Sequence, residues 1–207
     1  MTVLDLYKKE YLEKQFERTD LFCKIQKKYK IEKALYPGSY VHITPSFVIP
    51  YVVYVDSDKN AKRFFDDPNT IANFLEKNKK YKETPSFRFI HKDYSKKLDL
   101  AEEQFDLLVS QWAGPISQSC KKYLKLGGIL LANNSHADSG LAHLDPNYKL
   151  VAVVQFKNGK FNVSEKNLEA YFIPKKDQII TIDSLMLSGK GIGYTKTANS
   201  YIFEKLK

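Results

Sequence analysis

The 207 residues are 43% hydrophobic, which suffices for the core of one large domain, and no apolar stretch approaches the roughly 18 residues of a membrane span. Only Cys23 and Cys120 are present, and the first residues have no apolar segment of a secretory signal, so we expect a cytoplasmic protein without disulfide framework or metal site. The net charge of +9 comes from 30 Lys and three Arg interleaved with acids. Because recognition of phosphate and guanine favours Arg, this charge does not favour a nucleic-acid partner.

The N-terminal pattern predicts one amphipathic helix over residues 4–30. An apolar stripe runs among Lys and Glu there, and neither Gly nor Pro occurs before Pro37. We interpret this segment as a helix that packs on a sheet. The predicted organisation is therefore an N-terminal helical extension, residues 1–30, followed by a single domain, residues 31–207.

From residue 31 onward, short apolar strands alternate with helical stretches. The run Tyr51–Val55 is β-branched and aromatic, which is typical of a buried parallel strand. Alternation at this spacing predicts a parallel sheet with right-handed crossovers. The strands predicted in this part of the chain are residues 31–36, 51–55, 87–90, 105–110 and 129–132.

Several turn residues predict where helices begin and end. Thr44-Pro45 indicates a helix start with Thr44 as the N-cap. A helix from Asn60 is expected to break at Asp67-Pro68, and Asp67 would cap its second piece. Gly127-Gly128 indicates the C-terminus of a helix that starts at Ile116.

The C-terminal part has a different character. Residues 150–156 and 160–163 flank Asn158-Gly159, which is a strong hairpin signal. A short helix is expected from about Asp183 to Ser188-Gly189, and the last strand at residues 201–206. An open parallel sheet that ends in antiparallel strands is the predicted architecture.

Five sequence features in this order resemble class I S-adenosylmethionine-dependent methyltransferases. The turn Tyr36-Pro37-Gly38-Ser39 follows the first strand, and Asp56 ends the second strand 18 residues after Gly38. Asp93 follows the third strand, Phe105-Asp106 opens the fourth, and Leu124-Lys125-Leu126-Gly127-Gly128 precedes the fifth. The resemblance implies a Rossmann-like α/β fold: a mostly parallel seven-stranded sheet, an antiparallel C-terminal strand, and helices on both faces.

The resemblance also implies a cofactor, S-adenosylmethionine, and residues to hold it. Glycine after the first strand lets backbone approach the cofactor, and a carboxylate about 20 residues later accepts hydrogen bonds from ribose hydroxyls. Asp58 is an equally good helix cap, which leaves Asp56 for the ribose. The expected cofactor-binding residues are Gly38, Ser39, Asp56, Asp93 and Ser110.

The first motif departs from the family pattern of acid-x-Gly-x-Gly-x-Gly. Tyr36 stands where the acid belongs, and Tyr40 replaces the second glycine. Ser39, His42 and Thr44 are candidates for replacement polar contacts, and little room is left for the usual first helix. A non-catalytic methyltransferase-like binding module therefore stays as an alternative, with a nicotinamide-dependent oxidoreductase as a third hypothesis.

A dense polar run, Asn133 to Asp138, follows the fifth strand. His136 is the candidate general base, oriented by Asp138; the alternative is a helix cap with His136 in solvent. Trp112 after the fourth strand is interpreted as a packing residue rather than a substrate stacker, and Cys120 as core. The motifs of DNA base methylation are absent, which favours a small-molecule or protein acceptor over DNA. A small molecule is the preferred acceptor, and the pattern indicates no oligomeric state.

Overall fold

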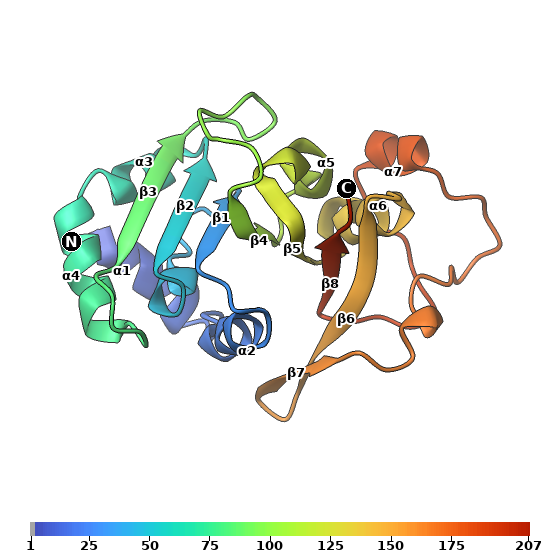
Figure 1. Cartoon of the computed structure of the whole chain (residues 1–207), viewed down its shortest axis with the longest axis horizontal. Coiled ribbons are helices and arrows are strands. Elements are labelled where there is room, and N and C mark those ends of the chain that lie inside the picture. Colours follow the sequence, from blue (N-terminus) through green and yellow to red (C-terminus); the bar gives the residue numbers. More distant parts are fainter. Residues whose placement is uncertain (1–2) are drawn as a thin grey trace. The chain divides into compact units, whose positions relative to one another are not determined.

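The computed structural model of the chain describes residues 3–207, which form eight strands with helices and helical turns between them (Figure 1). They group into two compact units, Met1–Leu98 and Asp99–Lys207. Over residues 3–207 no helix is both long and apolar enough to cross a membrane.

Unit 1 contains three parallel strands in the order β3-β2-β1, with β2 in the centre. The four inner residues of β2, Val52–Val55, are buried, because helices and loops cover both faces of this sheet. All three strands were predicted. Their bounds are β1 (Lys33–Pro37), β2 (Tyr51–Asp56) and β3 (Ser86–His91).

Two capped helices follow β2, as predicted. The Asp58 carboxylate caps α3 (Lys59–Phe65) by accepting from the amides of Asn60 at 2.7 Å and Ala61 at 3.1 Å. Asp67 caps α4 (Pro68–Asn78) by accepting from the Thr70 amide at 3.1 Å, with Pro68 in the first helical position. The predicted break between the two pieces is confirmed.

The single N-terminal helix expected over residues 4–30 is wrong. The structure has α1 (Val3–Tyr7), a π-helical turn (Lys8–Leu12) and a separate helix α2 (Thr19–Tyr29). Arg18 adopts a left-handed φ of 64° and ends any continuous helix. The break lets the buried Tyr7 hydroxyl donate to the Glu17 carboxylate at 3.1 Å. No local sequence pattern predicts this contact. The domain boundary near residue 30 stays a prediction.

The helix start expected at Thr44 is a 3-10 turn, Thr44–Phe47, in which Thr44 is not the N-cap. Its buried hydroxyl instead lies 2.9 Å from the Tyr7 hydroxyl. The segment between β1 and β2 contains no full helix, in agreement with the expectation that its length leaves little room for one.

Unit 2 contains five strands in the order β4-β5-β8-β6-β7. β4 and β5 are parallel, whereas β8 is antiparallel to both β5 and β6. β7 pairs with β6 through a hairpin at Asn158-Gly159, both of which have positive φ as the sequence predicts. The bounds are β4 (Phe105–Ser110), β5 (Leu124–Ala132), β6 (Tyr148–Lys157), β7 (Lys160–Ser164) and β8 (Ser200–Lys205).

Gly127 and Gly128 do not end a helix; both lie inside β5. The preceding helix α5 (Ile116–Ser119) is short and continues as a 3-10 turn, Lys121–Tyr123. The register of β5 against β4 shifts across the glycine pair, and Gly127 has a φ of 69°. The glycines therefore form a bulge in the strand, which explains their presence equally well.

In unit 2, α6 (Asp138–Leu144) packs on β6 and β8 of the sheet, and α7 (Ile182–Ser188) packs on α6. α6 follows a 3-10 turn, Ser135–Ala137, and α7 ends at Gly189 as predicted. Leu141 and Leu185 join these two helices in a small apolar cluster with Ala137. A further 3-10 turn spans Leu168–Ala170.

Candidate functional site

One candidate site is the carboxyl edge of the sheet in unit 1. Because Pro37 of β1 lies beside Val55 of β2, the two strands end together. The Gly38 amide donates to the Val55 carbonyl at 2.8 Å, and Gly38 has a φ of 62°, where a side chain would strain the backbone. The Gly38 turn and Asp56 therefore lie side by side.

The Asp56 carboxylate holds the loop that follows Gly38. Its Oδ2 accepts from the Tyr40 amide at 2.7 Å, and its Oδ1 accepts from the Asp58 amide at 2.8 Å. Since a carboxylate has about four acceptor positions, about two remain on this half-buried group. Asp56 is thus fixed in direction by two backbone amides and keeps capacity for further donors.

Tyr40 occupies the position of the family's second glycine and adopts a glycine-like backbone. Its φ is 48°, in the left-handed region, and the bond to Asp56 holds it there. Its hydroxyl bonds to the Asn60 side chain, and burial with the nearby Asp58 and Glu10 charges raises its pKa. The loop therefore accepts a bulky residue in place of a glycine, and the half-buried side chain of Tyr40 lies beside the loop.

Ser39 and Thr44 do not offer the replacement polar contacts that the sequence suggested. Both side chains are buried. Ser39 donates to the Tyr40 carbonyl at 3.3 Å, and Thr44 is engaged with Tyr7. Only the backbone of Ser39 remains for a ligand.

His42 is also a structural residue of unit 1. Its Nδ1 accepts from the Tyr36 hydroxyl at 3.1 Å, and its Nε2 donates to the Glu17 carbonyl at 3.0 Å. The ring stacks on Tyr11 with centroids 4.3 Å apart. Burial lowers the pKa of His42 to about 3, so the imidazole is neutral at physiological pH.

Asp93 lies two residues beyond the end of β3 and is exposed. Its Oδ1 accepts from the Ser95 amide at 2.8 Å, and this hydrogen bond lowers the pKa of Asp93. The group is ionised and solvent-accessible, and its role toward a cofactor stays a prediction.

A separate group of predicted residues lies at the carboxyl edge of β4 and β5 in unit 2. Ser110 of β4 lies beside Ala132 of β5, so the loops after these strands meet. Ser110 is buried, and its hydroxyl lies within hydrogen-bond distance of the Ala113 carbonyl and the Asp138 carboxylate. Its side chain therefore ties two loops together and does not face a ligand.

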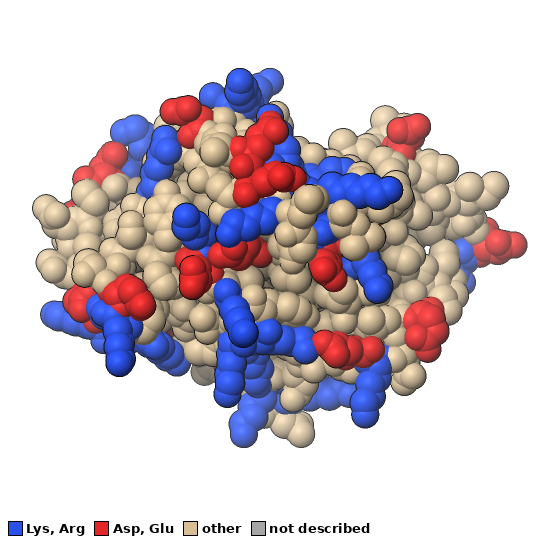
Figure 2. Space-filling view, in the orientation of Figure 1, with Lys and Arg blue, Asp and Glu red and all other residues tan. Residues whose placement is uncertain are grey.

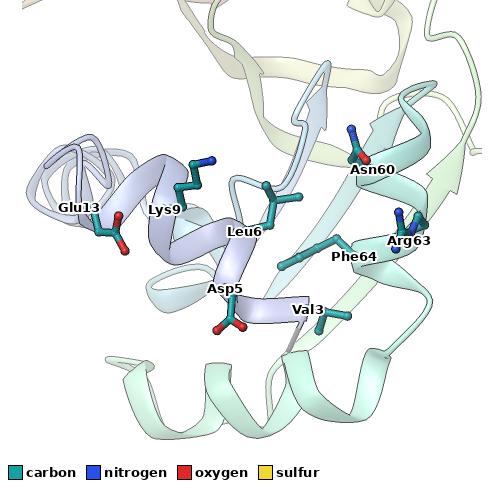
Figure 3. Close-up of a pocket in the computed structure, with 8 residues that line it drawn as sticks. All are labelled: Val3, Asp5, Leu6, Lys9, Glu13, Asn60, Arg63 and Phe64. Carbon is teal, nitrogen blue, oxygen red and sulfur yellow. The ribbon is translucent and has the colours of Figure 1, made fainter. Parts of the chain in front are cut away.

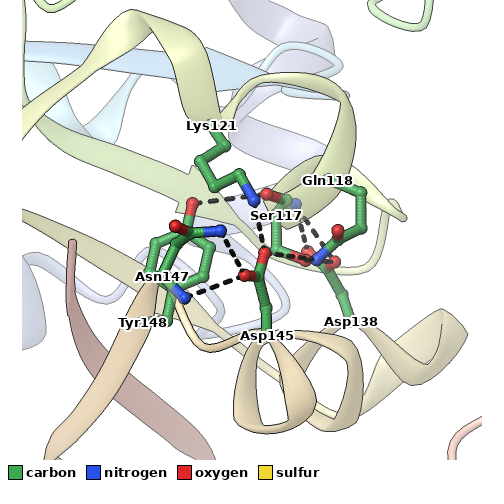
Figure 4. A network of polar contacts seen from close by, with 7 residues as sticks. All are labelled: Ser117, Gln118, Lys121, Asp138, Asp145, Asn147 and Tyr148. Carbon is green, nitrogen blue, oxygen red and sulfur yellow. Dashed lines mark hydrogen bonds and ion pairs between the residues drawn. The ribbon is translucent and has the colours of Figure 1, made fainter. Parts of the chain in front are cut away.

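Asp138 belongs to a polar cluster in which it lies beside Ser117 (Figure 4). The carboxylate is fully buried, and the Ser117 amide lies 3.1 Å from each of its oxygens. The hydroxyls of Ser117 and Ser110 also donate to it. Burial raises the pKa of Asp138, and these hydrogen bonds oppose the rise.

Asp138 does not orient His136. Within residues 3–207 no hydrogen bond joins the two side chains, and the oxygens of Asp138 are directed at Ser110 and Ser117. His136 has a φ of 52° and an exposed side chain, which matches the alternative of a histidine in solvent. A catalytic role for His136 stays a prediction without this partner.

Asn133, which sequence reasoning did not single out, holds the same edge. Its amide donates to the Ser110 carbonyl at 3.2 Å, and its Oδ1 accepts from the Ser135 amide at 3.1 Å. Trp112, in the adjoining loop, is 46% exposed. The interpretation of Trp112 as a buried packing residue is wrong, whereas Cys120 is fully buried in the core as expected.

The polar cluster extends to Asp145, at the end of α6 (Figure 4). Asp145 pairs with Lys121 and accepts from the Asn147 side chain at 2.7 Å, and these contacts lower its pKa. The Tyr148 hydroxyl donates to the Ser117 carbonyl at 3.3 Å. Most of these contacts join residues more than 20 positions apart, so no motif spacing could have identified them.

Neither a protein-family model nor a curated protein matches this sequence. Solved structures resemble its fold. Cofactor-bound Rv0187 from MTB has a TM-score of 0.50 and 9% identity, covering 71% of this chain and 77% of that one. The O-methyltransferase TomG from Streptomyces achromogenes, in complex with SAM, has a TM-score of 0.48 and 8% identity over 70% and 76%. The tRNA (m1A58) methyltransferase TrmI from Aquifex aeolicus has a TM-score of 0.46 and 14% identity over 91% and 69%.

At these identities the likeness establishes the fold alone. The order β3-β2-β1 in unit 1 and the succession β4-β5 in unit 2 are the two halves of the Rossmann-type order. An antiparallel strand, β8, lies between β5 and β6. β7 is the predicted second arm of the hairpin, and with it the strands number eight instead of the seven that the resemblance implies. The chain has a Rossmann-like α/β fold with an antiparallel C-terminal strand.

Proposed function

We propose that the protein binds S-adenosylmethionine and transfers its methyl group to a small-molecule acceptor. The observation that carries this proposal is the Gly38 turn beside Asp56, at the edge where open α/β folds bind ligands. Bound cofactor would supply an electrophilic methyl group. The protein would then act mainly by orientation, which needs no dedicated nucleophile.

The residues of unit 1 fit a ribose. The remaining acceptor positions of Asp56 suit two neighbouring hydroxyls, and the two amides that fix the carboxylate reduce the ordering that binding requires. Gly38 and the backbone of Ser39 would line the loop, and Asp93 would contribute an exposed carboxylate. In unit 2, Ser110 would position the loop after β4, while the exposed His136 is the proposed proton acceptor.

The alternative, a binding module without catalysis, also has an observation in its favour. Tyr40 fills the place of a glycine, and a 3-10 turn replaces the first helix. No helix N-terminus is therefore supplied by the segment between β1 and β2. This alternative predicts either no cofactor binding or binding without turnover.

Calorimetric titration separates these proposals. Wild-type protein, Asp56→Asn and Asp56→Ala are titrated with S-adenosylmethionine, its demethylated product and NAD, and melting curves confirm that each variant folds. We expect micromolar binding of the first two ligands and none of NAD. Charge-assisted hydrogen bonds are worth about 1.5–3 kcal/mol, so Asp56→Ala should bind at least ~10-fold more weakly, with Asp56→Asn in between.

Asp66→Asn is the matched control. Asp66 is an exposed acid just after α3, paired with Lys62, and its loss should leave the titration unchanged. Equal binding by wild type and Asp56→Ala would contradict the assigned ribose contact. Absence of binding by folded wild type would favour the alternative module, and binding of NAD instead would favour the oxidoreductase.

A further inference from the structure

A cavity of about 600 Å³ lies within unit 1, away from the Asp56 carboxylate, between the N-terminal helical segment and α3. Small-ligand sites commonly have volumes of roughly 300–1,000 Å³, so this groove is large enough for a compact organic molecule. The sequence indicated only a packing helix here. The lining residues are Val3, Asp5, Leu6, Lys9, Glu13, Asn60, Arg63 and Phe64 (Figure 3).

The lining combines an apolar part with two cations on opposite walls. Leu6 and Phe64 point toward each other across the groove, and Lys9 extends on the side of Asn60 (Figure 3). Over residues 3–207 the side chains of Lys9 and Arg63 form no ion pair or hydrogen bond. An anion held between these walls would therefore displace no internal partner.

Their sequence neighbours behave differently. Lys8 lies 3.9 Å from Asp5, and Lys62 lies 3.1 Å from Asp66, both along their own helices. Over the described part of the chain, the two cations that line the groove are thus unpaired, as is Lys59 of α3, which does not line it. Lys62 does not line the groove and provides a matched control for Arg63.

We propose that this groove binds a small monocarboxylate with an apolar or aromatic body. The planar fork of Arg63 suits a carboxylate, Lys9 adds a second positive charge, and the faces of Leu6 and Phe64 suit the body. Asp5 and Glu13 also line the groove, so its formal charge is zero. This balance favours a monoanion over a multiply charged phosphate.

The groove adjoins the edge that holds the Gly38 turn, but it does not depend on the proposed cofactor. Asn60 lies in the first turn of α3, and its side chain bonds to the Tyr40 hydroxyl. Tyr40 in turn donates its amide to Asp56. The groove is therefore linked to the loop after Gly38 through Asn60, while its lining residues are not those proposed to hold the cofactor.

The test is a titration of the full chain with 2-naphthoate and with the neutral 2-naphthamide, followed by the NMR shifts of Leu6 methyl groups. We expect 2-naphthoate to bind about tenfold more tightly than the amide. Arg63→Gln should remove most of that preference while leaving amide binding unchanged. Lys62→Gln should behave as wild type.

Two further variants keep the result specific. Leu6→Trp fills the groove and should abolish binding of both probes in a protein that melts normally. Asp56→Ala should bind 2-naphthoate as wild type does, whether or not the cofactor proposal holds. The proposal is overturned if the acid and amide bind equally, if neither binds, if Arg63→Gln changes nothing, or if Asp56→Ala abolishes binding of 2-naphthoate.

Discussion

At the scale of single residues, burial decides which ionisable groups take part in chemistry. His42 looked available for a ligand from its place after Gly38, but it is enclosed by Tyr36, Tyr11 and the Glu17 carbonyl. Its neutral ring links the loop after β1 to the N-terminal segment. A histidine of this kind contributes to stability in a pH-dependent way.

The first prediction concerns His42 and acid. Because burial lowers its pKa to about 3 from the ordinary 6.5, the unfolded chain binds the proton more readily between these values. Stability from His42 is therefore complete above pH 6.5 and lost as the pH falls toward 3, by up to about 1.4 kcal/mol per pH unit. Urea unfolding from pH 7 to pH 4.5 should show the difference between wild type and His42→Phe shrinking in acid.

The control for this prediction is the exposed His136. His136→Gln should differ from wild type by no more than about 0.5 kcal/mol in the free energy of unfolding, because its side chain is exposed. A constant difference between wild type and His42→Phe over the whole pH range would contradict the assigned burial.

The second prediction compares the two cysteines. Cys120 is fully buried, and burial raises its pKa to about 12, whereas Cys23 is partly exposed. Since the thiolate is the reactive form, iodoacetamide at pH 8 should modify Cys120 at least about tenfold more slowly than Cys23. Mass spectrometry of the folded chain, with urea-unfolded chain as the control, measures both rates. Equal modification rates of the two cysteines in the folded chain would contradict the burial of Cys120.

At the scale of elements, the ends of strands and helices in unit 2 are joined by one buried carboxylate. Asp138 begins α6 and receives donors from the end of β4 and from the first turns of α5. A buried acceptor with several donors is costly to remove, because each donor is left unsatisfied. We interpret Asp138 as a positioning residue for the loop that carries Trp112.

The third prediction follows from this arrangement. Asp138→Asn presents an amide hydrogen to groups that all donate, so the free energy of unfolding should fall by about 1–3 kcal/mol. Trp112 fluorescence should also become more accessible to acrylamide as its loop loosens. Urea unfolding at pH 7 measures the first effect, with the exposed Asp66→Asn expected within about 0.5 kcal/mol of wild type. Unchanged stability and quenching in Asp138→Asn would contradict the positioning role.

Element prediction from sequence succeeded where the signal is local. Asp58, Asp67 and the Asn158-Gly159 turn act through hydrogen bonds or φ values within a few residues, so their patterns could be recognised. The break at Arg18 and the bulge at Gly127 depend on contacts across the fold. Glycine at a helix end and glycine at a bulge look alike in a sequence, because both supply a positive φ.

At the scale of the whole molecule, charge is dispersed. Lysines and acids alternate over the face shown in Figure 2, and several lysines pair with acids on their own helices. As a fourth prediction, binding to a duplex DNA should be weak and non-specific. In a fluorescence anisotropy titration the affinity should fall steeply between about 50 and 200 mM salt, because salt competes with lysines for the phosphates. Tight, sequence-selective binding that persists at about 150 mM salt would contradict it.

The candidate site was predictable in part. Gly38 and Asp56 follow from strand ends and spacing, and the structure brings them together in unit 1. The residues that fix Asp56 and Asp138 could not be predicted, because Tyr40 acts through its amide and Ser117 lies 21 positions from Asp138. A sequence pattern can identify the residues at strand ends, but it does not show which of their polar atoms are engaged in hydrogen bonds within the fold.

The most direct test of the account is a crystal structure of the chain with the demethylated product of S-adenosylmethionine. The account predicts both ribose hydroxyls within about 2.5–3.0 Å of the Asp56 carboxylate oxygens, with the bonds to the Tyr40 and Asp58 amides retained. A nucleoside bound elsewhere on the folded chain, or an Asp56 carboxylate with no ribose contact, would contradict it.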